Sequence, residues 1–222
     1  MHTLAMFPLG SPLLPGSTIH LQVFEPRYLA MVADLLATDA PGDDAPALEF
    51  GVAMIERGHE VGGGDVRADV GCVARVIDLQ SLPDDRYAMT VLGVHRVRIV
   101  EWLADDPYPR AVVESWPDAP EPPGMVAANQ PVGRLVERIT ALLGDMAEHG
   151  ELPPAVVPPT PAALAARLAD DVSLAVYQLA AYAPLGPADR ARLLAVRGLV
   201  ERVAAFGEAL DDVEAAVKFR RS

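Results

Sequence analysis

The stretch RYAMTVLGVHRVRIV, residues 86–100, alternates between apolar and other side chains. A period of two predicts a β-strand, because successive side chains of a strand point to opposite faces. Gly93 is the expected place for a β-bulge, since a glycine inside a strand often marks one. The polar face is predicted to carry Arg96 and Arg98. The other face is predicted to carry Tyr87, Met89, Val91, His95, Val97 and Ile99.

Further strands are predicted on both sides of this stretch, at Phe50–Glu56, Cys72–Leu82 and Ala111–Trp116, where β-branched residues are frequent. Pro83-Asp84-Asp85 supplies turn residues between the second of these strands and the long one. Several strands with mostly short links predict a mixed barrel or sandwich.

One helix is expected within this strand-rich part. Glu25-Pro26 places a proline at a first helical position, which suits a helix start. Apolar residues then recur at helical spacing, so this face should pack on the barrel. They are Tyr28, Leu29, Val32, Leu35 and Leu36.

The remainder of the chain reads as helical. The proline-rich stretch 117–124, PDAPEPPG, fixes the backbone at several positions and predicts an extended connector. Apolar residues at spacings of three and four then predict a helix from Val132 to Met146. Thr160-Pro161 is a typical helix start, and the pattern continues to Tyr182 with a possible break near Asp170-Asp171.

Two more helices complete this half, a short one that carries Leu193 and Leu194 and a longer one from Leu199. The sequence therefore predicts an α+β chain with three parts: a strand-rich part at 1–116, a connector at 117–124 and a helical part at 125–222.

The charge balance excludes some partners. A formal net charge of -13 repels phosphate backbones, so nucleic acid is not expected as a partner. The single cysteine, Cys72, cannot form an internal disulfide, and Arg27 is the first arginine or lysine of the chain. No apolar run approaches the roughly 20 residues that span a bilayer. A cytoplasmic location without membrane association is expected.

Motifs for catalysis are not found in the sequence. A phosphate-binding loop needs a lysine after its glycines, and the only lysine, Lys218, stands near the end of the last helix. His59-Glu60 resembles the start of a zinc motif, but Gly63 occupies the place of the second histidine. Neither an enzyme nor a cofactor or metal site is predicted.

Three segments near the start of the chain carry a resemblance to a known family: Met6-Phe7-Pro8-Leu9, then Leu14-Pro15-Gly16, then LQVFEPRY at residues 21–28. Their order and spacing resemble the opening of the amino-terminal substrate-binding domain of Lon proteases. The segments EFGV at 49–52, VGCVA at 70–74 and GVHRVRI at 93–99 are similar to later strands of that domain. Cys72 and Val97 depart from the residues common in the family.

The resemblance implies a PUA-like β-barrel with one packed helix, followed by a helical bundle. It also implies that the chain binds a peptide, an unfolded segment or a partner protein, without the ATPase and peptidase of the full protease.

Six residues are the candidates for such binding: Phe24, Glu25, Arg27, Tyr28, His95 and Arg96. Glu25 and Arg27 would line a groove beside the first helix, where a peptide docks. In the alternative interpretation, Arg27 ties the helix to loops while Phe24 and Tyr28 lie in the core. By the same reasoning, Arg96 would only face water.

Two other function classes stay open. A small-molecule-binding protein or an enzyme that reuses the barrel would need a deep pocket with converging polar groups. RNA binding, suggested by the PUA-like fold, is disfavoured by the net charge of -13.

Overall fold

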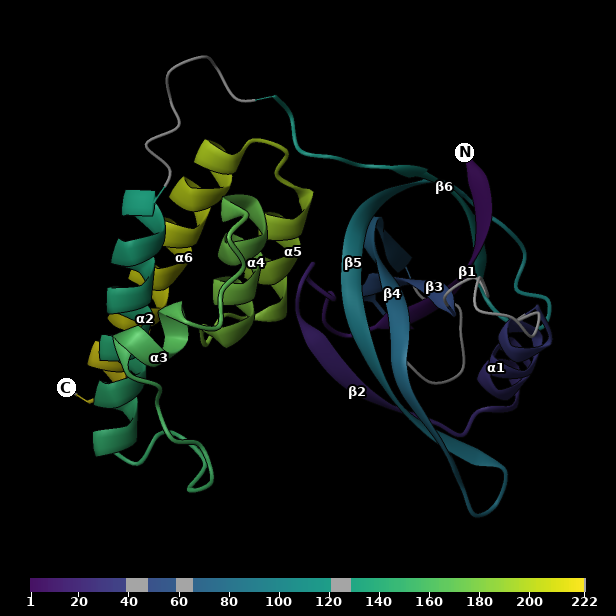
Figure 1. Cartoon of the computed structure of the whole chain (residues 1–222), viewed down its shortest axis with the longest axis horizontal. Coiled ribbons are helices and arrows are strands. Elements are labelled where there is room, and N and C mark those ends of the chain that lie inside the picture. Colours follow the sequence, from purple (N-terminus) through teal and green to yellow (C-terminus); the bar gives the residue numbers. More distant parts are fainter. Residues whose placement is uncertain (39–47, 59–65, 121–128, 222) are drawn as a thin grey trace. The chain divides into compact units, whose positions relative to one another are not determined.

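The computed structural model describes residues 1–38, 48–58, 66–120 and 129–221. These residues form two compact units, Met1–Pro117 and Asp118–Ser222 (Figure 1). The first unit contains the strands, and the second contains five helices within its described residues.

Six strands of the first unit form one sheet, in the order β2-β5-β4-β3-β1-β6. β6 pairs with both β1 and β5, so the strands β1, β3, β4, β5 and β6 form a closed hydrogen-bonded ring. β2 lies outside this ring and pairs along the first half of β5. The β1–β3 pair is parallel and the other pairs are antiparallel. The elements of this unit are β1 (His2–Leu9), β2 (Thr18–Val23), α1 (Pro26–Thr38), β3 (Glu49–Arg57), β4 (Val66–Leu82), β5 (Arg86–Trp102) and β6 (Arg110–Ser115).

β3 to β6 and α1 confirm the elements that the sequence pattern predicts. The turn between β4 and β5 uses Asp84 and Asp85 at φ values of 63° and 54°, the left-handed region that turn residues tolerate. β1 and β2 were not predicted from periodicity. In β1 the adjacent residues Met6 and Phe7 are both buried, so this strand lacks an alternating pattern.

The central strands are buried on both faces. On one face Phe7, Phe50 and Cys72 pack with Tyr28 and Met31 of α1. On the other face lies a second apolar cluster, in which Met6 and Val73 are the chain neighbours of Phe7 and Cys72. Its members are Met6, Ala53, Val73, Val97, Ile99, Ala111 and Val113. Burial on both faces explains why apolar residues follow one another in these strands.

A β-bulge in β5 changes which side chains face the core. Two steps along β4, from Cys72 to Ala74, are matched by three steps along β5, from Arg96 to Gly93. The extra residue shifts the phase of the strand, so Arg96 lies opposite Cys72 and is only 4% exposed. His95 is exposed, although it alternates with the buried Val97 and Ile99. The prediction of a bulge at Gly93 is confirmed. The prediction that Arg96 faces water is wrong, and so is the prediction that His95 packs with the apolar residues.

The second unit consists of helices in the expected order. Its elements are α2 (Asn129–Glu148), α3 (Pro161–Ala165), α4 (Val172–Tyr182), α5 (Pro187–Ala195) and α6 (Leu199–Arg220). Thr160 caps α3, and Asp171 caps α4 by accepting a hydrogen bond from the Leu174 amide at 2.8 Å. The break near Asp170-Asp171 is therefore confirmed, and its cause is a new helix start.

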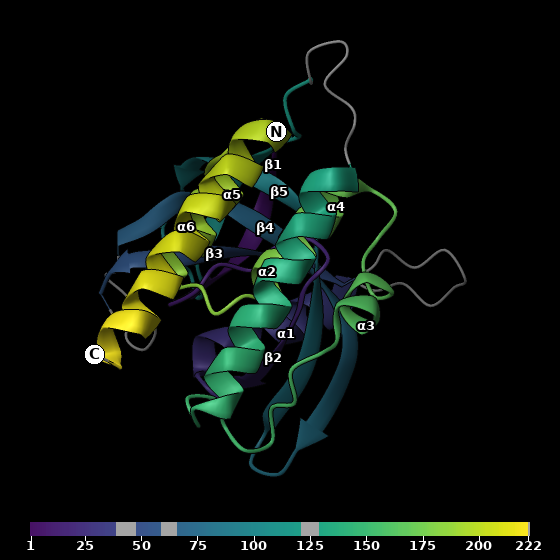
Figure 2. The same cartoon turned by 90° about the vertical axis from the view of Figure 1, so that its left-hand side faces the viewer.

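Ion pairs join α2 to α6, which run alongside each other (Figure 2). Arg138 of α2 contacts Asp211 at 2.7 Å and Glu214 at 2.9 Å. At the end of α6, Arg221 binds Glu151 at 2.6 Å and Asp145 at 2.7 Å. The basic end of α6 thus pairs with carboxylates of its own unit.

A buried arginine fixes the start of this unit. Arg202 of α6 is 0% exposed, binds Asp118 and the Ser173 hydroxyl, and lies 4.2 Å from the centroid of the Tyr177 ring. Asp118 belongs to the stretch 117–124 that the sequence predicts to be a connector, and this side chain is anchored. Residues 121–124 of that stretch lie outside the described residues. None of the helices in the described residues has the length and apolar character that a membrane span requires.

Candidate functional site

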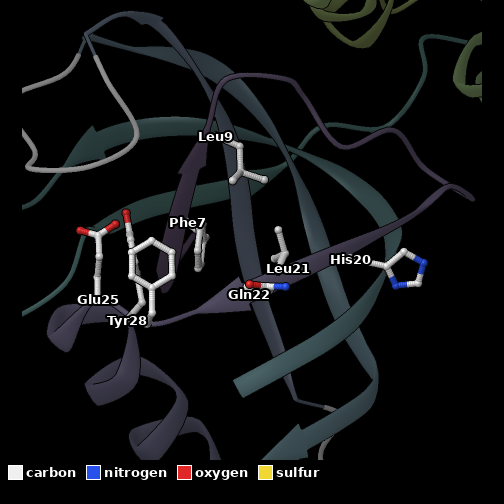
Figure 3. Close-up of a pocket in the computed structure, with 8 residues that line it drawn as sticks. Phe7, Leu9, His20, Leu21, Gln22, Glu25 and Tyr28 are labelled. Atoms are coloured by element: carbon white, nitrogen blue, oxygen red, sulfur yellow. The ribbon is translucent and has the colours of Figure 1, made fainter. Parts of the chain in front are cut away.

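A pocket of about 230 Å³ lies in the first unit, where β1, β2 and the start of α1 meet (Figure 3). Its lining is apolar at the floor and polar at the rim. The lining residues are Phe7, Leu9, His20, Leu21, Gln22, Phe24, Glu25 and Tyr28.

The floor of the pocket is a fixed aromatic pair. The rings of Phe7 and Tyr28 stack with centroids 4.1 Å apart, and the centroid of the Phe50 ring lies 6.0 Å from that of Phe7. All three residues are buried. Because these rings pack into the core of the unit, the pocket floor is preformed.

The walls of the pocket carry apolar side chains that water still reaches. Leu9 and Leu21 are half-buried, and Phe24 is 55% exposed. Covering such surface with an apolar group is favourable, by about 25 cal/mol for each Å² removed from water. The pocket therefore suits an apolar group of a ligand.

The rim carries one carboxylate, which is held by its neighbour. The Arg27 Nε donates a hydrogen bond to Glu25 Oε2 at 3.1 Å, and the Arg27 guanidinium lies 4.6 Å from the centroid of the Tyr28 ring. On the β2 side, the His20 ring hydrogen-bonds the Thr90 hydroxyl at 2.9 Å. These contacts orient the polar rim around the apolar floor.

Three of the six predicted site residues, Phe24, Glu25 and Tyr28, line this pocket, and Arg27 borders it through Glu25. The alternative that Phe24 lies in the core is wrong, because more than half of its side chain is exposed. His95 and Arg96 do not line the pocket, and Arg96 does not face water.

Five lining residues were not among the predicted site residues: Phe7, Leu9, His20, Leu21 and Gln22. They lie within or beside the segments that carry the family resemblance, so a sequence signal was present. What the sequence did not reveal is that β1 and β2 meet at one cavity, because their approach depends on the tertiary fold.

The lining offers little chemistry for catalysis. Among its residues there is neither a lysine, a cysteine nor a hydroxyl nucleophile beside a base. Burial raises the pKa of the Cys72 thiol from 9.0 to about 12, so this side chain is an inert thiol in the core. No cluster of potential metal ligands occurs in the described part of the chain, and His59-Glu60 falls outside it.

Comparison with known proteins gives this site a context. Residues 3–212 match the family described as the ATP-dependent protease La (LON) substrate-binding domain. The chain belongs to this family. All eight residues that line the pocket fall within the matched range.

Two curated relatives are Lon proteases. Lon protease 2 of Myxococcus xanthus is 30% identical over 118 residues, and the Lon protease of Anaeromyxobacter dehalogenans is 29% identical over 118 residues. Each alignment covers 52% of this chain and 13% of the relative. The match thus spans about an eighth of the length of these proteases.

Two solved structures share the fold of the Lon amino-terminal domain. The Lon N-terminal domain protein from Xanthomonas campestris has a TM-score of 0.61 and 25% identity, covering 93% of this chain and 97% of its own. The N-terminal domain of the Mycobacterium avium complex Lon protease also has a TM-score of 0.61, at 15% identity, covering 95% of this chain and 99% of its own.

Proposed function

We propose that this chain is a non-catalytic polypeptide-binding module of the Lon substrate-binding family, and that it holds a peptide, an unfolded segment or a partner protein at the pocket of β1, β2 and α1. One observation carries the proposal: an apolar pocket with a preformed aromatic floor opens to solvent beside the exposed Phe24. Soluble proteins keep such surface where it contacts a ligand.

The size of the pocket favours a side chain over a whole small molecule. Sites for drug-sized ligands have volumes of roughly 300–1,000 Å³, and this pocket of about 230 Å³ is smaller. Of the polar groups in the lining, the Glu25 carboxylate is paired with Arg27 and the His20 ring with Thr90, whereas an active site directs several polar groups at one ligand. The alternative of a small-molecule-binding protein or an enzyme is therefore less well supported than polypeptide binding.

We also infer that the closed ladder of the first unit is a PUA-like β-barrel and that the second unit is a helical bundle. The pairing of β6 with both β1 and β5 supports the barrel, and the ion pairs of Arg138 between α2 and α6 support the bundle. The net charge of -13 argues against nucleic acid as the partner of this barrel.

A pair of matched variants tests the proposed site. Phe24→Ala removes an exposed wall of the pocket, and Phe219→Ala removes a phenylalanine that is 82% exposed at the end of α6. Fluorescence anisotropy with a labelled lysozyme, a basic chain kept unfolded by reduction and alkylation, should show saturable binding by the wild-type chain. Phe24→Ala should weaken it by about tenfold, as for a central interface residue, and Phe219→Ala should leave it unchanged.

Two results would contradict the proposal: an absence of saturable binding at micromolar concentrations, or equal affinities for the two variants. A purified protein that turns over a small molecule at this pocket would favour the alternative function instead.

A further inference from the structure

We propose that the bound segment is an extended peptide with basic and apolar residues, which adds as a strand to the free edge of β2 and places one apolar side chain in the pocket. This inference rests on the proposed function and specifies the ligand and its mode of binding.

The first observation is the pairing of β2. Its six residues, Thr18–Val23, pair in unbroken register with β5, from Thr18↔Leu92 to Val23↔Tyr87. Among the described residues β2 pairs with no other strand. The backbone groups on its other edge are thus available to a strand of another molecule.

The second observation is the position of the pocket along that edge. Three consecutive residues of β2, His20, Leu21 and Gln22, line it (Figure 3). Successive side chains of a strand point to opposite faces, so a cavity that touches all three extends along the edge of the strand. A peptide strand beside β2 would therefore run past the pocket, with every second side chain directed to the same face.

The third observation is the absence of the usual protection for an edge strand. Edges are commonly blocked by lysine, by proline or by a bulge. The sequence TIHLQV of β2 contains neither a charged residue nor a proline, and its register with β5 has no shift. An unprotected edge next to an apolar pocket is the arrangement used for strand addition by peptide-binding domains.

Charge complementarity determines the kind of peptide. The lining contains one carboxylate, that of Glu25, which is paired with Arg27 at 3.1 Å, and no lysine or arginine. The chain as a whole carries a net charge of -13. Such a field attracts a cationic segment and repels an acidic one, and it also opposes the pairing of β2 with β2 of a second copy.

The test uses fluorescein-labelled synthetic peptides of the sequence Lys-Thr-Val-Leu-Val-Thr-Lys. Two further peptides carry N-methyl groups at alternate backbone nitrogens, one at the odd and one at the even positions, and a fourth has glutamate in place of both lysines. In an added strand only one set of amides faces β2. One N-methyl series should therefore weaken binding by about tenfold or more, and the other by less than about threefold.

The acidic peptide should bind about tenfold more weakly than the basic one at low salt, and this difference should shrink as salt is added. Hydrogen exchange of the complex should show newly protected amides within residues 18–23, which binding through side chains alone would not produce.

The outcomes separate the inference from the proposed function. If neither these peptides nor unfolded lysozyme bind, the proposed function itself fails. If the peptides bind but both N-methyl series lose equal affinity and β2 gains no protection, only the strand addition is overturned. A peptide-free protein that is dimeric by light scattering, with β2 amides already protected, would assign the edge to a second copy and also overturn the inference.

Discussion

Phe7 of β1 and Tyr28 of α1 stack face to face, with ring planes inclined by 15° and centroids 4.1 Å apart. This contact joins a strand to a helix, between two residues that are 21 positions apart in the chain. The same two rings form the pocket floor, so the packing of the first unit and the shape of the candidate site depend on one pair.

Replacing Phe7 by alanine should cost about 3–5 kcal/mol of unfolding free energy, because a buried ring and its stacking partner are lost together. Urea unfolding followed by circular dichroism measures the change. Phe219→Ala is the matched control, since Phe219 is 82% exposed, and it should change the free energy by no more than about 0.5 kcal/mol. Similar small losses in both variants would show that the stack contributes little.

Local features of the helices could be predicted from the sequence, whereas the orientation of side chains in the bulged strand β5 could not. Thr160 and Asp171 are capping residues whose role depends on their immediate neighbours; the helix start at Thr160 was predicted, whereas near Asp171 only a possible break was predicted. Arg96 was assigned to the wrong face because the bulge after Gly93 shifts the phase of β5. A two-residue period cannot reveal a phase shift when buried side chains occur on both faces.

The candidate site was found only in part for a similar reason. Phe24, Glu25 and Tyr28 lie within five consecutive residues, so one local sequence motif contains all three. Leu9 and Leu21 belong to strands that are not paired with each other, so no local spacing connects them. Their approach follows from the packing of both strands against α1.

Gly93→Ala should destabilise the chain by at least about 2–3 kcal/mol. A Cβ atom at this position would lie 2.2 Å from the Leu14 carbonyl oxygen. The backbone cannot easily move away, since the Gly93 N–H donates to the Ser17 carbonyl at 2.9 Å and the Gly93 carbonyl accepts from Gly16 at 2.8 Å.

Gly144→Ala is the control for this change. Gly144 lies inside α2, and a Cβ there meets no atom within 4 Å. Alanine should stabilise the helix by roughly 0.5–1 kcal/mol. The midpoint of thermal unfolding should therefore fall for Gly93→Ala and rise for Gly144→Ala. A rise for both variants would show that the backbone near Leu14 moves enough to remove the close contact.

Asp118→Ala should cost about 3–5 kcal/mol, because it leaves the fully buried guanidinium of Arg202 without its carboxylate. Glu208→Ala is the comparison. It breaks the ion pair with Arg192, in which the two side chains are 61% and 57% exposed, and should cost no more than about 1 kcal/mol. Denaturant unfolding measures the unfolding free energy of the two variants. Comparable losses of free energy would mean that the buried ion pair of Arg202 with Asp118 contributes no more than an exposed one.

The buried thiol predicts how stability changes in alkaline solution. Burial raises the pKa of Cys72 from 9.0 to about 12, so the unfolded chain releases this proton at a lower pH than the folded chain. The folded state then binds more protons between these values, and its stability should fall as the pH rises from about 9 towards about 12, by about 1.4 kcal/mol per pH unit.

Cys72→Ala removes this contribution while leaving the titration of other groups in place. The difference in unfolding free energy between wild type and variant should therefore slope with pH in this window and be flat below it. A difference that stays constant from pH 7 to pH 11 would show that the thiol titrates equally in both states.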